Sequence, residues 1–209
     1  ARTLGDITPD ADVFLGLSAA GALKPEMLKT MAANPIILAM ANPDPEITPE
    51  LAKATRSDVI IGTGRSDYPN QVNNALCFPY MFRGALDVGA TTINEAMKVA
   101  AVWAIADLAH AEQPDVANAP YGTEDIKFGP DYLIPKPFDP RLVMKVAPAV
   151  AKAAMDSGVA TRPLADIEAY RDQLSEFVYQ SGLQMRPVFA AAKKSPQRIV
   201  YCEGEDERV

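Results

Sequence analysis

Three short apolar runs near the start of the chain constrain its fold more than any other feature. They span residues 12–17, 35–41 and 58–62 of a 209-residue sequence, and each is continuous rather than alternating. Continuous apolar runs are typical of parallel strands that are covered on both faces. Their spacing of about 23 residues leaves room for one short helix between successive strands. The sequence therefore predicts an α/β fold in which these strands form half of a doubly wound parallel sheet.

Helix signals fill both gaps between these runs. Pro25 suits the first turn of one short helix, and Thr48 can cap a second helix that has Pro49 at its first position. Farther along, Thr92 and Glu95 have the form of a capping box that opens a third helix. The chain is thus expected to alternate strands with helices and then to continue as helices.

The rest of the chain is expected to be mostly helical after one long irregular stretch. Residues 112–140 are dense in Pro, Asp and Gly and are expected to form an ordered loop. The pair Asp139-Pro140 is predicted to start a helix that runs towards Asp156. A further helix is predicted over roughly residues 164–179 from its apolar stripe. Residues 186–197 are expected to form a linker.

Composition excludes several classes of partner. The net charge is −7 and the sequence has no basic cluster, so nucleic acid and anionic membrane surfaces are unsuitable partners. No apolar run approaches the roughly 20 residues needed to span a bilayer. Cys77 and Cys202 stand far apart and neither belongs to a CxxC pair, which argues against a disulfide framework or a zinc site. The cytoplasm is the expected compartment.

Loops that can face a ligand follow all three predicted strands. They span residues 18–21, 42–45 and 64–74, and in a parallel sheet they meet at one edge, where ligands bind. Asn42 is explained either by ordinary turn chemistry before a proline or by contact with a ligand. Asn73 and Asn74 are explained either by helix capping or by ligand contact, and one cap leaves the second amide free.

Other polar residues favour structural roles. Arg65, Asp67 and Tyr68 are expected to fix their loop by an ion pair and a hydrogen bond. His110 is the only histidine and is expected at the exposed end of a helix, so no Ser-His-Asp arrangement can be assembled. The acidic run at residues 203–207 is expected to be a solvated loop. The sequence has no G-x-G-x-x-G after a strand and no cluster of carboxylates suited to a divalent metal.

Several of these blocks together resemble one enzyme family. Residues 14–23 read FLGLSAAGAL, residues 41–46 read ANPDPE, and residues 64–74 read GRSDYPNQVNN. These motifs, continued by Phe78-Pro79 and by RGALD at residues 83–87, resemble the large multidomain NADP-dependent malic enzymes of bacteria. The similarity runs from about residue 1 to residue 183, and the long block at residues 64–74 is its most specific part.

The resemblance implies a domain arrangement. Residues 1–110 would be part of a Rossmann-like NAD(P)-binding domain, and residues 111–185 a helical extension of the malic enzyme part. Residues 186–197 would link this part to the start of a phosphotransacetylase-like domain at residues 198–209, which read RIVYCEGEDERV. In the family that following domain is linked to assembly and to regulation by acetyl-CoA, and a homo-oligomer is expected.

The resemblance also implies an activity, the oxidative decarboxylation of L-malate to pyruvate and CO2 with NADP, or alternatively NAD, and a Mg or Mn ion. The family's general-acid Tyr, general-base Lys and metal carboxylates are expected upstream of this segment, so no catalytic or metal residue is assigned here. Ser18, Ala19 and Asn42 would contact the cofactor, and Asn73 and Asn74 would contact malate. The isolated segment is expected to be inactive.

Two other classes of function stay open on the residues alone. A different hydroxy-acid or amino-acid dehydrogenase could use the same half-sheet, although the block at residues 64–74 argues against it. A non-catalytic segment that docks between domains or subunits would suit the apolar stripe of the helix expected at residues 164–179.

Overall fold

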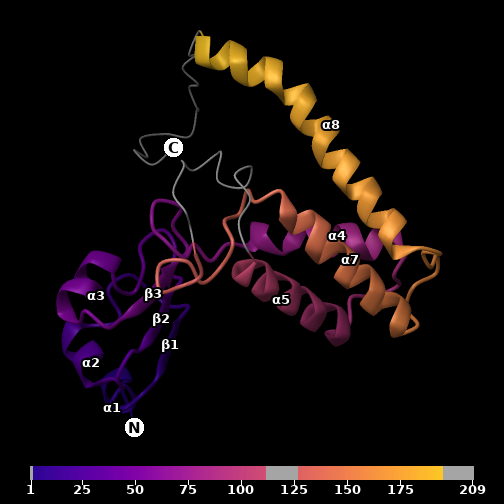
Figure 1. Cartoon of the computed structure of the whole chain (residues 1–209). Coiled ribbons are helices and arrows are strands. Elements are labelled where there is room, and N and C mark those ends of the chain that lie inside the picture. Colours follow the sequence, from indigo (N-terminus) through magenta and orange to yellow (C-terminus); the bar gives the residue numbers. More distant parts are fainter. Residues whose placement is uncertain (1, 112–126, 195–209) are drawn as a thin grey trace, which may run out of the picture. The chain divides into compact units, whose positions relative to one another are not determined.

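The computed structural model of this chain describes residues 2–111 and 127–194 (Figure 1). Contacts divide the chain into a unit that ends at Ile167 and a second unit that begins at Glu168. The segments at residues 112–126 and 195–209 lie outside the described residues. They include part of the expected loop, the last residues of the expected linker, the acidic run, Cys202 and the expected start of a further domain.

Three parallel strands form the sheet of the first unit, as the sequence predicts. They are β1 (Val13–Gly16), β2 (Ile36–Ala39) and β3 (Ile60–Thr63), in the order β1-β2-β3. In their register Phe14 lies beside Ile37, which lies beside Ile61. A short helix α1 (Leu4–Ile7) precedes β1, and helices α2 (Pro25–Thr30) and α3 (Pro49–Thr55) connect the strands. The predicted α/β class and parallel sheet are confirmed.

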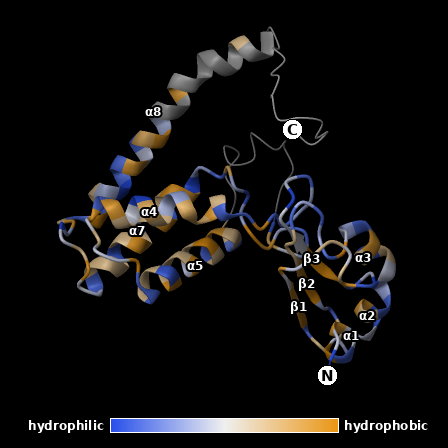
Figure 2. Cartoon of the chain, turned by 180° about the vertical axis from the view of Figure 1, so that it is seen from behind, coloured by the Kyte–Doolittle hydropathy of each residue, from blue (hydrophilic) through white to orange (hydrophobic). Residues whose placement is uncertain are grey.

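In the described part of the chain, the hydrophobic core of the sheet lies on the face that α2 and α3 cover. Ile37, Ala39 and Ile61 point to the face that α2 and α3 cover, and they pack there with Leu28 and Ala52. Two successive right-handed crossovers in one direction place both helices on the same side of a sheet. The strands are mostly hydrophobic on both faces (Figure 2), which is why the sequence pattern does not distinguish the two faces.

The opposite face of β1 is open in the part of the chain that the structure describes. Val13 is 53% exposed and Leu15 is 60% exposed. The expectation that these strands are covered on both faces is therefore wrong for β1 within the described residues.

The remaining helices of the first unit form a packed group. A single 3-10 turn, η1 (Asn74–Leu76), leads into α4 (Phe78–Asp87), and α5 (Glu95–His110) follows. Both α4 and α5 pack against α7 (Arg141–Asp156). Gly84 of α4 approaches α7 so closely that a Cβ there would collide with a backbone carbonyl of that helix.

The start of α5 differs from its prediction. Asn94, not Thr92, caps this helix, because its side-chain oxygen accepts the Met97 N–H at 3.1 Å. Its amide nitrogen also donates to the Ser157 hydroxyl at 2.9 Å. Either residue can cap a helix, and the choice between neighbours is settled by such tertiary contacts.

The last helix is much longer than predicted. Helix α8 runs over Ile167–Lys194, whereas its expected end was near residue 179. Residues 186–194 of the expected linker are therefore helical, and their role as a linker stays a prediction. The helix predicted from Asp139-Pro140 is confirmed as α7. No helix in the described ranges is both long and apolar enough to cross a membrane.

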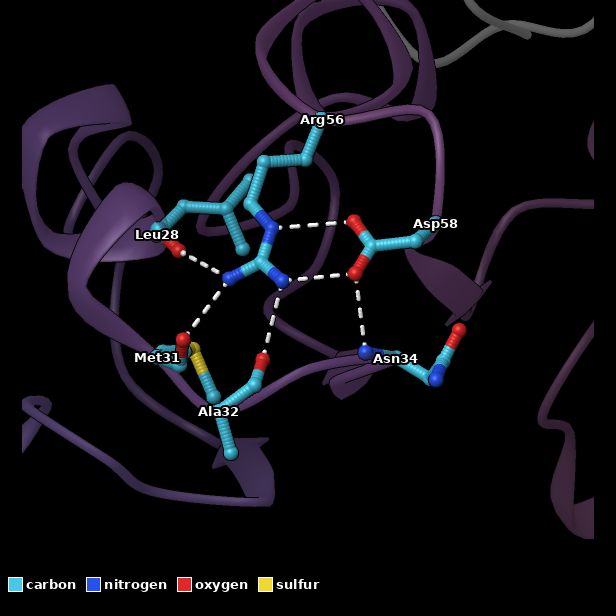
Figure 3. Close-up of polar contacts among 6 residues, drawn as sticks. All are labelled: Leu28, Met31, Ala32, Asn34, Arg56 and Asp58. Carbon is cyan, nitrogen blue, oxygen red and sulfur yellow. Dashed lines mark hydrogen bonds and ion pairs between the residues drawn. The ribbon is translucent and has the colours of Figure 1, made fainter.

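One guanidinium holds the end of α2 against the start of β3. Arg56 donates from Nη1 to the carbonyls of Leu28 and Met31 and from Nη2 to that of Ala32 (Figure 3). Its Nε and Nη2 also bind the carboxylate of Asp58, which accepts the Asn34 N–H as well. The last carbonyls of a helix have no intrahelical partner, so this side chain takes the place of a C-terminal cap.

We expect Arg56→Met to lower the free energy of unfolding by about 2 kcal/mol, because it leaves these carbonyls without their charged donor. Equilibrium urea unfolding followed by circular dichroism measures the change. The matched control is Lys53→Met, which removes an exposed ion pair to Asp131 and should have little effect. Equal losses in the two variants would contradict this role for Arg56.

Candidate functional site

The loops after the three strands all leave from the carboxyl edge of the sheet. Ser18 and Ala19 follow β1 and Asn42 follows β2, and all three are exposed. An ion pair of 4.0 Å between Arg65 and Asp44 links the second loop to the third. The predicted convergence of the loops on one edge is confirmed, and this edge is the candidate site.

A buried carboxylate that the sequence analysis assigned no role holds the first two loops together. The Oε1 atom of Glu46 accepts the Ser18 N–H at 2.7 Å and the Ser18 hydroxyl at 3.2 Å, and Oε2 accepts the Ala41 N–H at 3.0 Å. Glu46 is fully buried. Gly16 makes room for it, since a Cβ there would lie 2.5 Å from the carboxyl carbon. A carboxylate directly after Pro45, at the end of a strand loop, was the only signal in the sequence.

Two opposing effects act on the pKa of Glu46. Burial disfavours the charged form and raises the pKa. The N–H groups of Ser18, Ala41 and Glu46 itself, with the Ser18 hydroxyl, stabilise the charged form and lower it. The hydrogen bonds prevail, so the pKa of Glu46 lies below its usual value and the carboxylate is ionised at neutral pH.

The side chain of Asn42 is available at this edge. Asn42 is exposed, and the Asn42–Pro43 peptide bond is cis. Within the described residues its amide makes no hydrogen bond, so the turn does not depend on the side chain. The two explanations for Asn42, a turn before proline and contact with a ligand, are therefore compatible. The backbone makes the turn, and the side-chain amide is left free for a ligand.

The two adjacent asparagines divide their roles. Asn73 caps η1, because its Oδ1 accepts the Ala75 N–H at 2.9 Å. Asn74 is exposed, and its side chain makes no hydrogen bond to any described residue. One amide is thus a cap and the other is free, as the sequence suggested. An exposed neutral amide can both donate to and accept from a polar ligand.

The third loop is fixed by the side chains expected to do so. Arg65 binds Asp67 at 2.6 Å and lies over the ring of Tyr68, 5.1 Å from its centroid. The Tyr68 hydroxyl donates to Glu50 at 3.1 Å. This bond raises the pKa of Tyr68 and confirms a structural role for the group. Asn70, to which the sequence analysis gave no separate role, is the one buried amide of this loop.

A cavity of about 570 Å³ is lined in part by the same loop. Residues 66–71 line one wall, and residues from the stretch 127–137 line the other. None of the five predicted site residues lines it. The candidate site is therefore identified by the loops that follow the strands, and not by this cavity.

Metal-binding groups are sparse in the described ranges. Among residues 2–111 and 127–194, no three His, Cys, Asp or Glu side chains lie close enough to hold a metal ion. His110 lies at the exposed end of α5, as expected, and its ring contacts that of Phe128 with centroids 3.8 Å apart. Cys77 is a free thiol whose pKa is raised by burial.

Comparison with known proteins gives consistent matches. A family model described as the malic enzyme NAD-binding domain matches residues 6–121. The chain is 65% identical over 208 residues to the NADP-dependent malic enzyme of Salmonella typhimurium (strain LT2), and 64% identical over 209 residues to the NAD-dependent malic enzyme of Rhizobium meliloti (strain 1021). All of the chain is covered in both cases, and it spans 27% of the length of each relative.

The fold has a solved counterpart. The crystal structure of malic enzyme from Pyrococcus horikoshii Ot3 matches with a TM-score of 0.72 at 35% identity. The match covers 91% of this chain and 40% of that one.

The buried Glu46 leads to a prediction about stability and pH. Glu46→Gln places an amide N–H2 among N–H donors and should lower the free energy of unfolding by about 1–3 kcal/mol at neutral pH. Because the folded-state pKa of Glu46 is lowered, its contribution is present above the unfolded-state pKa and is lost as pH falls through the folded-state pKa.

The difference between the natural protein and Glu46→Gln should therefore shrink as pH falls from about 7 to about 3. Urea unfolding at several pH values measures it. Glu26→Gln is the control, since Glu26 is exposed on α2. A difference for Glu46→Gln that stays constant over this pH range would contradict the role of the carboxylate.

Proposed function

This chain belongs to the malic enzyme family, and on that basis we propose that it is a segment of an enzyme that oxidatively decarboxylates L-malate to pyruvate and CO2 with reduction of NADP. The observation that carries the proposal is a pair of exposed amides after two strands of the sheet: Asn42 follows β2, and the free Asn74 lies at the end of the block at residues 64–74. Ligands of open parallel sheets bind at this edge. The relatives named above are malic enzymes.

The nicotinamide cofactor is NADP in this proposal, with NAD as the alternative. The relative from Salmonella typhimurium is named for NADP and the one from Rhizobium meliloti for NAD, at nearly equal identity. When bound, either cofactor accepts a hydride from malate. Ser18, Ala19 and Asn42 are proposed to border it, because their loops offer exposed backbone and small side chains that let a ligand approach closely.

Asn73 and Asn74 are proposed to hold malate. The Asn74 amide is exposed and free, and Asn73 keeps its Nδ2 group while Oδ1 caps η1. A dicarboxylate needs donors that fix its orientation, and neutral amides supply them without cancelling its charge. Asn73 caps η1 and Asn74 is its first residue, so both lie where the loop after β3 enters a helical segment.

The divalent ion implied by the resemblance finds no ligand set in the described ranges. We therefore assign it no residue and no step here. The general-acid Tyr and general-base Lys are likewise proposed to lie outside this segment. The same holds for regulation by acetyl-CoA and assembly as a homo-oligomer, which the proposal attributes to a phosphotransacetylase-like domain that begins at residues 198–209.

Removal of the free amide should impair the reaction with malate. In the complete enzyme, we expect Asn74→Ala to lower kcat/KM for malate by about ten- to hundredfold, the equivalent of one or two lost hydrogen bonds. The KM for the cofactor should change little. Initial rates of malate-dependent NADP and NAD reduction measure both quantities.

The matched control is Asn94→Ala, which removes a helix-capping asparagine at α5 instead. It should reduce stability and leave kcat/KM for malate within about twofold of the natural value. Equal kinetic losses in the two variants, or none in Asn74→Ala, would argue against the proposed contact. Reduction of neither cofactor by the complete, folded enzyme with malate would refute the activity itself.

The 209-residue polypeptide alone is expected not to oxidise malate. It offers no metal site in its described part, and no residue of it is assigned as general acid or base. Purified segment, malate, Mg or Mn and either cofactor should give no absorbance of reduced nicotinamide above the blank. A malate-dependent signal would place the catalytic groups within this chain after all.

A further inference from the structure

The block at residues 64–74 carries the two amides proposed to bind malate, yet ten residues, 64–73, separate β3 from η1. A loop of this length holds a side chain in place only if its backbone is anchored along the way. Backbone pairing anchors part of it, since the Val72 N–H donates to the Thr63 carbonyl at 2.8 Å. Arg65, Asp67 and Tyr68 fix the first part of the loop, and the residues between Tyr68 and Val72 need an anchor of their own.

Asn70 supplies that anchor. It is 7% exposed and has a φ of 55°, in the left-handed region. Its Nδ2 donates to the Ile61 carbonyl of β3 at 3.0 Å and to the Pro130 carbonyl at 2.7 Å. Its Oδ1 accepts the Leu133 N–H at 2.8 Å. The Asn70 side chain therefore makes three hydrogen bonds, all to backbone groups, and these groups belong to two segments that are distant in the sequence.

The two segments that Asn70 joins are each held by other backbone contacts. Ile61 lies in the central part of β3 and is buried. Pro130 lies within, and Leu133 directly follows, a tight turn in which Gly129 and Tyr132 exchange backbone hydrogen bonds of 2.9 and 3.2 Å. The backbone of Asn70 also touches the sheet, since a Cβ on Gly62 would lie 2.9 Å from the Asn70 carbonyl oxygen.

We propose that Asn70 is a positioning residue for malate: by fixing the loop between β3 and the turn at residues 129–132, it sets where the Asn74 amide lies. The inference rests on the proposed function, since it needs Asn74 to contact the substrate. Asn70 itself is buried and acts only through the loop. Loss of its three hydrogen bonds should leave Asn74 able to occupy several positions, of which few bind malate productively.

The variant that isolates this role is Asn70→Gly. Glycine adopts a positive φ without strain, so the change removes the amide and leaves the backbone conformation allowed. The matched control is Asn34→Gly, because Asn34 also has a positive φ, 52°, but is exposed and lies in the loop before β2. Asn70→Asp is a second variant of similar size that keeps the acceptor and removes both donors.

The kinetic test is a double-mutant cycle in the complete enzyme. Asn70→Gly alone should lower kcat/KM for malate by about tenfold or more, with cofactor KM nearly unchanged. In the Asn74→Ala background the same change should cost less than about threefold, because the amide it positions is already gone. Asn34→Gly should have no effect in either background. Equal losses in both backgrounds would mean general destabilisation and overturn the proposal.

Hydrogen exchange gives a readout that does not depend on activity. Peptides covering residues 64–76 should exchange faster in Asn70→Gly and in Asn70→Asp, and at the natural rate in Asn34→Gly. Unchanged exchange in this segment overturns the proposal whatever the kinetics. Faster exchange combined with normal kinetics in Asn74→Ala overturns the substrate contact and, with it, this role of Asn70. The kinetics of Asn74→Ala therefore test the proposed malate contact, and hydrogen exchange in the Asn70 variants tests the positioning role separately.

Discussion

A buried carboxylate bound by backbone N–H groups determines the shape of the candidate site. Loops that leave neighbouring parallel strands at the same edge carry backbone N–H groups there. Each of these N–H groups needs an acceptor, either from the protein or from water. Glu46 accepts from two such loops at once. The Ser18 and Asn42 loops consequently keep one fixed separation, and their exposed atoms form a surface that is present before any ligand arrives.

The sequence predicted the strands and the class of the sheet because both depend on local pattern. Continuous apolar runs and well-spaced prolines identify β1 to β3 and the starts of α2 and α3 without tertiary information. It did not predict which face of β1 is open, because Val13 and Leu15 are as hydrophobic as residues of the buried face. Asn94 was missed as the cap of α5 for a similar reason, since Thr92 has the same local chemistry.

The sequence predicted the exposed residues of the candidate site but not the buried residues that hold its loops, and this difference has a physical basis. The residues that face solvent, Asn42 and Asn74, stand in recognisable loops and were named from their position after strands. The residues that hold those loops, Glu46 and Asn70, bond to backbone groups as far as 63 residues away, and no sequence period records such contacts. Buried polar side chains of this kind are found only when their partners are seen.

The Arg56 network has a consequence for the order in which this fold can form. Helix α2 has six residues, too few to be stable alone, and its last carbonyls find their donors 24 to 28 residues later in the chain. During synthesis, α2 therefore cannot complete its C-terminal turn until α3 has left the ribosome and Arg56 has reached it. The first strand–helix unit of this half-sheet is therefore not complete before the second, because Arg56 from the second unit supplies the donors for the end of α2.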